Sequence, residues 1–179
     1  MLSRTLLLAS LVLLAACGGD SGPTNPGGIA DKFSASVTGD ANHDMSGHAV
    51  YAINSGVGFG LELVDTTQGT LYFEQQQGAP SSGDNALADA TTGEVGPGSL
   101  WAVVLLTPPA GPAEGMLYSK SGTITITSQS GDELKGNFSF TATGTVNGVD
   151  GEATVQVSGS FDAKNGSVST PVLRIERID

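Results

Sequence analysis

The densest group of side chains able to bind a metal or move a proton lies in the stretch GDANHDMSGHA. Asp40, Asn42 and Asp44 alternate there as oxygen ligands do at the start of an EF-hand calcium loop. Met45 stands where that loop needs glycine, and Tyr51 where it needs the bidentate glutamate, so an EF-hand is excluded. We predict an ordinary polar turn between strands, with a looser calcium site as the alternative and a histidine-containing transition-metal site behind it.

The rest of the sequence offers little for catalysis. The only histidines are His43 and His48, so a serine–histidine or zinc mechanism would have to use this same stretch. The motifs G-x-S-x-G, H-E-x-x-H, G-x-G-x-x-G and the P-loop are absent. A glycosidase needs two carboxylates facing a cleft, but Glu62, Glu74 and Glu176 fall at outward strand positions, where we expect a solvated surface. We therefore predict a protein that is not an enzyme and has no catalytic cofactor.

Aromatic residues are the remaining candidates for binding a ligand. Trp101 opens the apolar run WAVVLL, which lies between two long irregular segments, residues 77–98 and 107–115. We interpret this run as a central strand buried on both faces. The alternative is a binding rim in which Trp101, Tyr72 or Tyr118 offers an aromatic platform to a sugar or a peptide.

Apolar and hydroxyl residues alternate with a period of two along much of the chain. Ile124 and Ile126 alternate with threonines, and the next apolar–polar alternation follows the turn sequence SGDEL, so residues 121–143 are predicted to form a hairpin. Five phenylalanines take the inward positions of their strands and are predicted core residues: Phe33, Phe59, Phe138, Phe140 and Phe161. Further strands are predicted at residues 32–39, 47–54, 57–64, 69–75, 99–106, 151–163 and 172–178.

About ten short strands separated by glycine-rich turns, with no sustained helical period, describe an all-β domain. We predict that residues 33–179 form a single antiparallel β-sandwich, with a small up-and-down β-barrel as the alternative. Acidic residues outnumber basic ones by 18 to 7, and no basic stripe is present, so the composition excludes a nucleic-acid-binding protein. The single cysteine rules out an intramolecular disulfide.

That cysteine closes a short hydrophobic leader. Residues 1–16 combine a basic start with an apolar stretch too short to span a bilayer, which is typical of a secretory signal peptide. The residues Leu14-Ala15-Ala16-Cys17 resemble the lipobox of bacterial lipoproteins. The resemblance implies cleavage before Cys17, a diacylglycerol on its thiol and an acyl chain on its new amino group. Two or three such chains would hold the protein stably on a membrane, its first predicted partner.

A glycine- and proline-rich segment follows the cysteine. We predict that residues 17–32 carry the lipid and form a flexible tether, which places the protein outside the cytoplasm. In the lipoprotein family an aspartate directly after the cysteine often marks retention at the inner membrane. Gly18 stands there in this chain, which favours the outer membrane if the host has one.

A second resemblance covers about 60 residues. SGTITITSQSGDELKGNFSFTATG and VQVSGSFDA resemble the strands of a group of uncharacterised bacterial lipoproteins, which implies a β-sandwich and brings no activity. We predict a lipid-anchored cell-envelope protein acting as a non-enzymatic binding or structural module for an envelope protein or a glycan. The alternative is a carrier that encloses a small apolar ligand in a barrel cavity, and behind it a hydrolase.

Overall fold

The computed structural model describes residues 31–54, 58–107 and 114–168. The predicted signal peptide, Cys17, residues 18–30 and the predicted strand at residues 172–178 lie outside these ranges. Within them, no helix has the length and apolar character needed to cross a membrane.

Nine strands and no helix make up the described part of the chain, so the prediction of an all-β domain is confirmed. The strands are β1 (Lys32–Gly39), β2 (His43–Asn54), β3 (Gly58–Asp65), β4 (Gly69–Gln75), β5 (Gly83–Leu87), β6 (Leu100–Leu106), β7 (Gly115–Ser130), β8 (Glu133–Val146) and β9 (Ala153–Asn165). The predicted hairpin across SGDEL is the β7–β8 pair.

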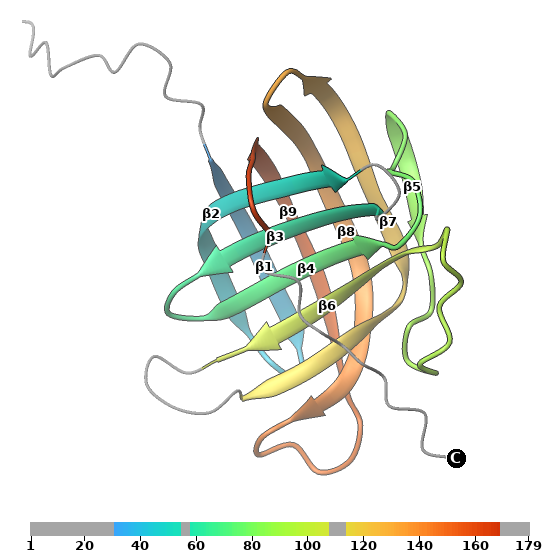
Figure 1. The fold of residues 1–179 in the computed structure, drawn as a ribbon. Coiled ribbons are helices and arrows are strands. Elements are labelled where there is room, and N and C mark those ends of the chain that lie inside the picture. Colours follow the sequence, from blue (N-terminus) through green and yellow to red (C-terminus); the bar gives the residue numbers. More distant parts are fainter. Residues whose placement is uncertain (1–30, 55–57, 108–113, 169–179) are drawn as a thin grey trace, which may run out of the picture.

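The strands form one sheet in the order β1-β2-β3-β4-β6-β5-β7-β8-β9, and β9 pairs with β1, so the order is that of a closed barrel (Figure 1). We call it the closed sheet. The two separate sheets of the predicted sandwich are replaced by one continuous sheet. A purely antiparallel arrangement was also a wrong prediction, because β2 pairs with β9 and β5 with β6 in parallel. The exchange of β5 and β6 also departs from a simple up-and-down order.

Alternation along each strand decides which side chains enter the closed sheet. Ile124 and Ile126 of β7 are buried, as are Val155 and Val157 of β9, while the residues between them point outward. Since successive residues of a strand point to opposite faces, closing the sheet places one set inside and leaves the other outside. The inward and outward assignments made from the sequence are confirmed for these strands.

Phenylalanine rings fill the centre of the closed sheet. The ring of Phe73 on β4 lies 5.2 Å from that of Phe138 and 5.7 Å from that of Phe140, both on β8. Phe161 on β9 stacks on Phe138 with the ring centroids 6.4 Å apart. All five predicted core phenylalanines are buried. Such ring pairs add about 0.5–1.5 kcal/mol each beyond the burial of their area.

A short strand was missed within the segment predicted to be irregular. β5 pairs with β7 and meets β6 only at Leu87 and Leu100. Ser119 of β7 is fully buried at a β-bulge. Its side chain bonds to the backbone of β6 and of the residue that follows β5, at the point where these two strands separate. Its hydroxyl donates to the carbonyl of Ala88 at 2.9 Å and accepts from the backbone N–H of Ala102 at 3.0 Å. One hydroxyl therefore fixes the start of the loop that follows β5.

Replacing Ser119 by alanine should lower the free energy of unfolding by about 2 kcal/mol, because a buried N–H and a partly buried carbonyl lose their partner. Urea unfolding followed by circular dichroism measures the change. Ser158→Ala is the matched control, since this serine lies exposed on the outer face of β9. Equal stabilities of the two variants would contradict the role assigned to Ser119.

Candidate functional site

The outer face of the closed sheet has two chemically different halves. Over β1, β8 and β9 the outward side chains are polar. They include Ser34, Ser36, Asn137, Ser139, Thr141, Gln156, Ser158 and Ser160, and also the charged residues Glu133, Lys135 and Asp162. Over β3, β4, β6 and β7 one row of cross-strand neighbours runs Glu62, Tyr72, Val103 and Tyr118. In Figure 1 the polar strands β1, β8 and β9 lie behind β3 and β4. The second half carries the aromatic residues and is the candidate site.

The three aromatic candidates meet in one cluster on this outer face. Ala90, Trp101 and Val103 are buried together, and Tyr72 and Tyr118 are among the partly buried residues packed against them. Trp101 keeps only 6% of its surface exposed, although it points out of the closed sheet. Ala90 belongs to the loop after β5, which packs over this face. β6 is therefore buried on both faces, as the interpretation of WAVVLL predicted.

The buried indole N–H of Trp101 lacks a hydrogen-bond acceptor among the described residues. A buried unpaired donor costs about 1–3 kcal/mol. Trp101 is the cross-strand partner of Glu74, which lines the groove described next.

A groove of about 300 Å³ lies next to this cluster. Its lining comes from β2, β3, β4 and the residues that follow β9. We call it the outer groove, and the lining residues used below are Ala52, Gly60, Tyr72, Glu74 and Val168. Ala52 pairs with Gly60 and Gly60 with Glu74, so three of these residues form a row across the sheet. Small side chains at the first two positions leave the depression open.

Tyr72 and Glu62 are joined beside the groove. The Tyr72 hydroxyl donates to a Glu62 carboxylate oxygen at 3.1 Å. Burial, together with the neighbouring Glu62 charge and this hydrogen bond, raises the pKa of Tyr72 to about 12. The phenol therefore stays protonated and acts as a hydrogen-bond donor with a fixed orientation.

Both carboxylates at this site depart from the sequence prediction of a solvated surface. Glu62 points outward, but only 9% of its surface is exposed, because its neighbours on this face are large. Burial raises the pKa of Glu74 above its ordinary value. The alternation predicted the side of the sheet correctly. It carried no information on what packs over that side.

Two of the three residues of the candidate calcium site bond to the backbone. A carboxylate oxygen of Asp40 accepts from the backbone N–H of Thr154 at 2.7 Å, and the Asn42 side chain donates to the Gly39 carbonyl at 3.2 Å. Asp44 lies exposed on β2, paired with Ser36 of β1. Within the described ranges, no group of three or more histidine, cysteine, aspartate or glutamate residues is placed to hold a metal ion.

The two histidines lie apart from the groove lining. His43 contacts Gln68 through its Nδ1 at 2.9 Å, and its Nε2 lies 4.0 Å from a Glu114 oxygen. His48 is exposed, with its Nδ1 3.6 Å from a carboxylate oxygen of Asp31. The structure brings neither histidine to the aromatic cluster.

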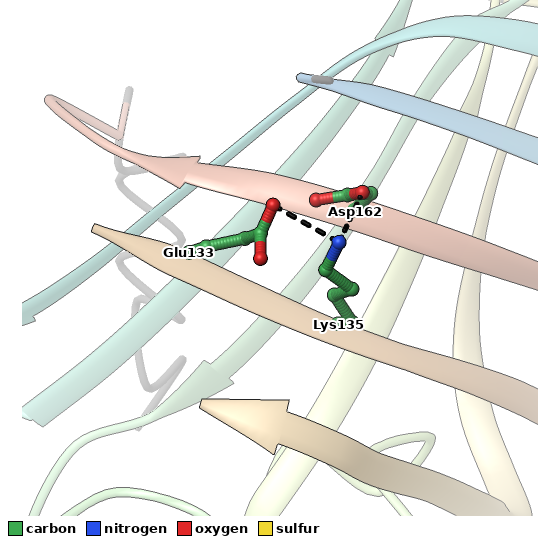
Figure 2. Close-up of polar contacts among 3 residues, drawn as sticks. All are labelled: Glu133, Lys135 and Asp162. Atoms are coloured by element: carbon green, nitrogen blue, oxygen red, sulfur yellow. Dashed lines mark hydrogen bonds and ion pairs between the residues drawn. The ribbon is translucent and has the colours of Figure 1, made fainter. Parts of the chain in front are cut away.

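A charged cluster elsewhere on the sheet has a structural explanation. Lys135 of β8 contacts Asp162 of β9 at 2.9 Å and Glu133 at 3.0 Å (Figure 2). Hydrogen bonds to these two carboxylates raise the pKa of Lys135. The cluster links β8 and β9 on the partly exposed outer face, where solvent weakens such ion pairs.

No family model matches the chain, and the searches of curated proteins and of solved structures also gave no match. The identification of the candidate site therefore depends on the geometry of its residues.

The tyrosine at the groove gives a direct test of its environment. Tyr72 should remain protonated well above 10.0, its ordinary pKa, and ionise at about 12. Glu62→Gln should lower this pKa, since the variant removes the charge that opposes the phenolate. NMR titration of tyrosine ring carbons measures both values, with Glu133→Gln as the control on β8. Because the folded-state pKa is raised, Tyr72 stabilises the fold below pH 10, and this contribution is lost as the pH rises through 12.

Proposed function

We propose that this protein is a lipid-anchored, non-enzymatic binding module of the bacterial cell envelope, and that the outer groove binds a glycan. Cys17 carries the lipid, and residues 18–32 connect it to the domain. The host membrane is the first partner, and the outer membrane is the site of anchoring in a diderm host. The module needs no metal or organic cofactor.

The observation that carries this proposal is the combination of side chains at the outer groove. Tyr72 offers part of an aromatic ring, while Glu74 offers hydrogen-bond acceptors to hydroxyl groups. Ligand sites are typically concave, largely apolar and supplied with a few oriented polar groups. A sugar ring has an apolar face for the tyrosine and hydroxyl groups for the carboxylate, so it suits this mixture.

The interior of the closed sheet is packed with side chains. This favours the outer groove over the interior as the binding site. The rings of Phe73, Phe138, Phe140 and Phe161 contact one another there, and leucine, valine and alanine side chains surround them. A carrier for an apolar ligand would need a lined cavity where these rings pack. The outer groove needs no rearrangement of this core.

Anchoring is tested by replacing the lipidated residue. Cys17→Ala should release the protein from the membrane fraction, because no thiol remains to accept the diacylglycerol. Fractionation of cells followed by immunoblotting measures the distribution. Ser21→Ala, in the same segment, is the control and should stay with the membrane. A Cys17→Ala protein that remains membrane-bound would contradict lipid anchoring.

Glycan binding is tested by NMR titration of residues 18–179 with neutral and N-acetylated trisaccharides. Amide shifts should cluster at Gly60, Tyr72 and Glu74. Tyr72→Ala should weaken binding about tenfold, equivalent to about 1.4 kcal/mol. Thr141→Ala is the matched control, since this residue lies on the polar half of the outer face.

Two outcomes would overturn this assignment. Shifts absent from the groove with every trisaccharide, in a protein whose spectrum is that of a folded chain, would remove the glycan. An apolar compound retained in native mass spectra and lost on denaturation would favour the carrier.

Adding millimolar calcium should leave the thermal midpoint unchanged, and a rise would restore the calcium site at Asp40, Asn42 and Asp44.

A further inference from the structure

The described chain ends inside the outer groove. At the end of β9, Asn165 pairs with Tyr51 of β2, and the backbone N–H of Gly166 donates to the Tyr51 carbonyl at 2.9 Å. The next residues line the groove, and a Val168 methyl lies only 3.3 Å from where a Cβ on Gly60 would stand. The polypeptide thus passes over β2 and arrives above β3.

A row of cross-strand partners lies on the outer face of the sheet next to Val168. Ala52, Gly60, Glu74 and Trp101 are successive cross-strand partners on β2, β3, β4 and β6. Neighbouring strands are about 4.8 Å apart, so the distance from β3 to β6 is about 10 Å. Eleven residues remain after Val168, and an extended chain of that length spans up to about 36 Å. The remaining chain is long enough to cross this face.

Side-chain chemistry also favours contact between residues 169–179 and the outer groove. The groove lining contains Glu74 and, among the described residues, no lysine or arginine. Glu62 lies beside it, bonded to Tyr72. Residues 169–179 contain Arg174 and Arg177, two of the three arginines in the chain, together with Val172, Leu173, Ile175 and Ile178. The segment that follows the groove therefore offers four apolar side chains and two guanidinium groups, while Glu176 and Asp179 bring its formal side-chain charge to zero.

We propose that the outer groove is the docking site of the chain's own residues 169–179, which cross β3 and β4 and supply Arg174 and Arg177 to its acidic side. The segment covers apolar surface around Gly60 and Tyr72, and its two arginines lie near the carboxylates of Glu62 and Glu74. It occupies the surface assigned above to the glycan, so an external ligand must displace it. This docking rests on the geometry of the groove and does not depend on the identity of that ligand.

Paramagnetic NMR on residues 18–179 tests the docking. This chain has no cysteine of its own, so Glu176→Cys gives a single attachment point for a nitroxide label. The amide signals of Gly60 and Glu74 should lose at least half their intensity. Those of Ser139 and Ser158, on the polar half of the outer face, should be unaffected. Equal intensity losses at the two pairs would overturn the proposal.

Charge removal provides the matched comparison. Arg174→Gln with Arg177→Gln should restore the Gly60 and Glu74 signals, whereas Thr170→Ala should not. Broadening that persists in the double variant would overturn the role of the arginines and the proposal with it. The amide spectrum of each variant checks that the closed sheet is retained.

The same double variant separates this inference from the proposed function. Its trisaccharide affinity should rise several-fold if docking and glycan binding share the groove. Docking observed without any glycan binding would leave the inference standing and overturn the ligand. Glycan binding of equal strength in both proteins, with no selective broadening, would overturn the docking alone.

Discussion

Pairing of β1 with β9 is the constraint on which the other features of this protein depend. It joins the two ends of a nine-stranded sheet, with Phe33 opposite Phe161 and Val37 opposite Val157. Once the sheet is closed, every second side chain enters a single interior, and no helix is needed to cover an apolar face. The remaining side chains all lie on an outer face, and any binding surface outside the core must be built there.

The outer face shows how a closed sheet can acquire a site without opening its core. Over β1, β8 and β9 it carries serine, threonine, glutamine and a few charged side chains, which suit contact with water. Over β4 and β6 it carries Tyr72, Trp101 and Val103, which require cover. The loop after β5 covers the indole and Ser119 fixes the start of that loop, while Val168 covers Gly60 from the other side. The groove lies beside Tyr72, and its lining comes from β2, β3, β4 and the residues that follow β9.

Sequence patterns predicted the strands and their inward residues because both follow from local alternation. β5 was missed because GDNAL is short and has no apolar alternation, and it pairs with residues about forty positions away on β7. The burial of Glu62 and Trp101 was not predictable for a related reason. Alternation predicts which face of the sheet a side chain lies on. Whether that side chain is exposed to solvent depends on packing between residues far apart in the sequence. The aromatic candidates were brought together, whereas the acidic residues of the groove were taken for an ordinary solvated surface.

The place where the described chain begins bears on how an anchored module would present its groove. The backbone N–H of Ala49 on β2 donates to the carbonyl of Asp31 at 3.3 Å, so the chain enters the fold alongside this strand. Ala52, three residues further along β2, lines the groove, and three strand residues span about 10 Å. Attachment and groove are therefore neighbours on one strand. With the proposed anchor on Cys17, the side of the domain that carries the groove would be the side that the chain enters from the membrane.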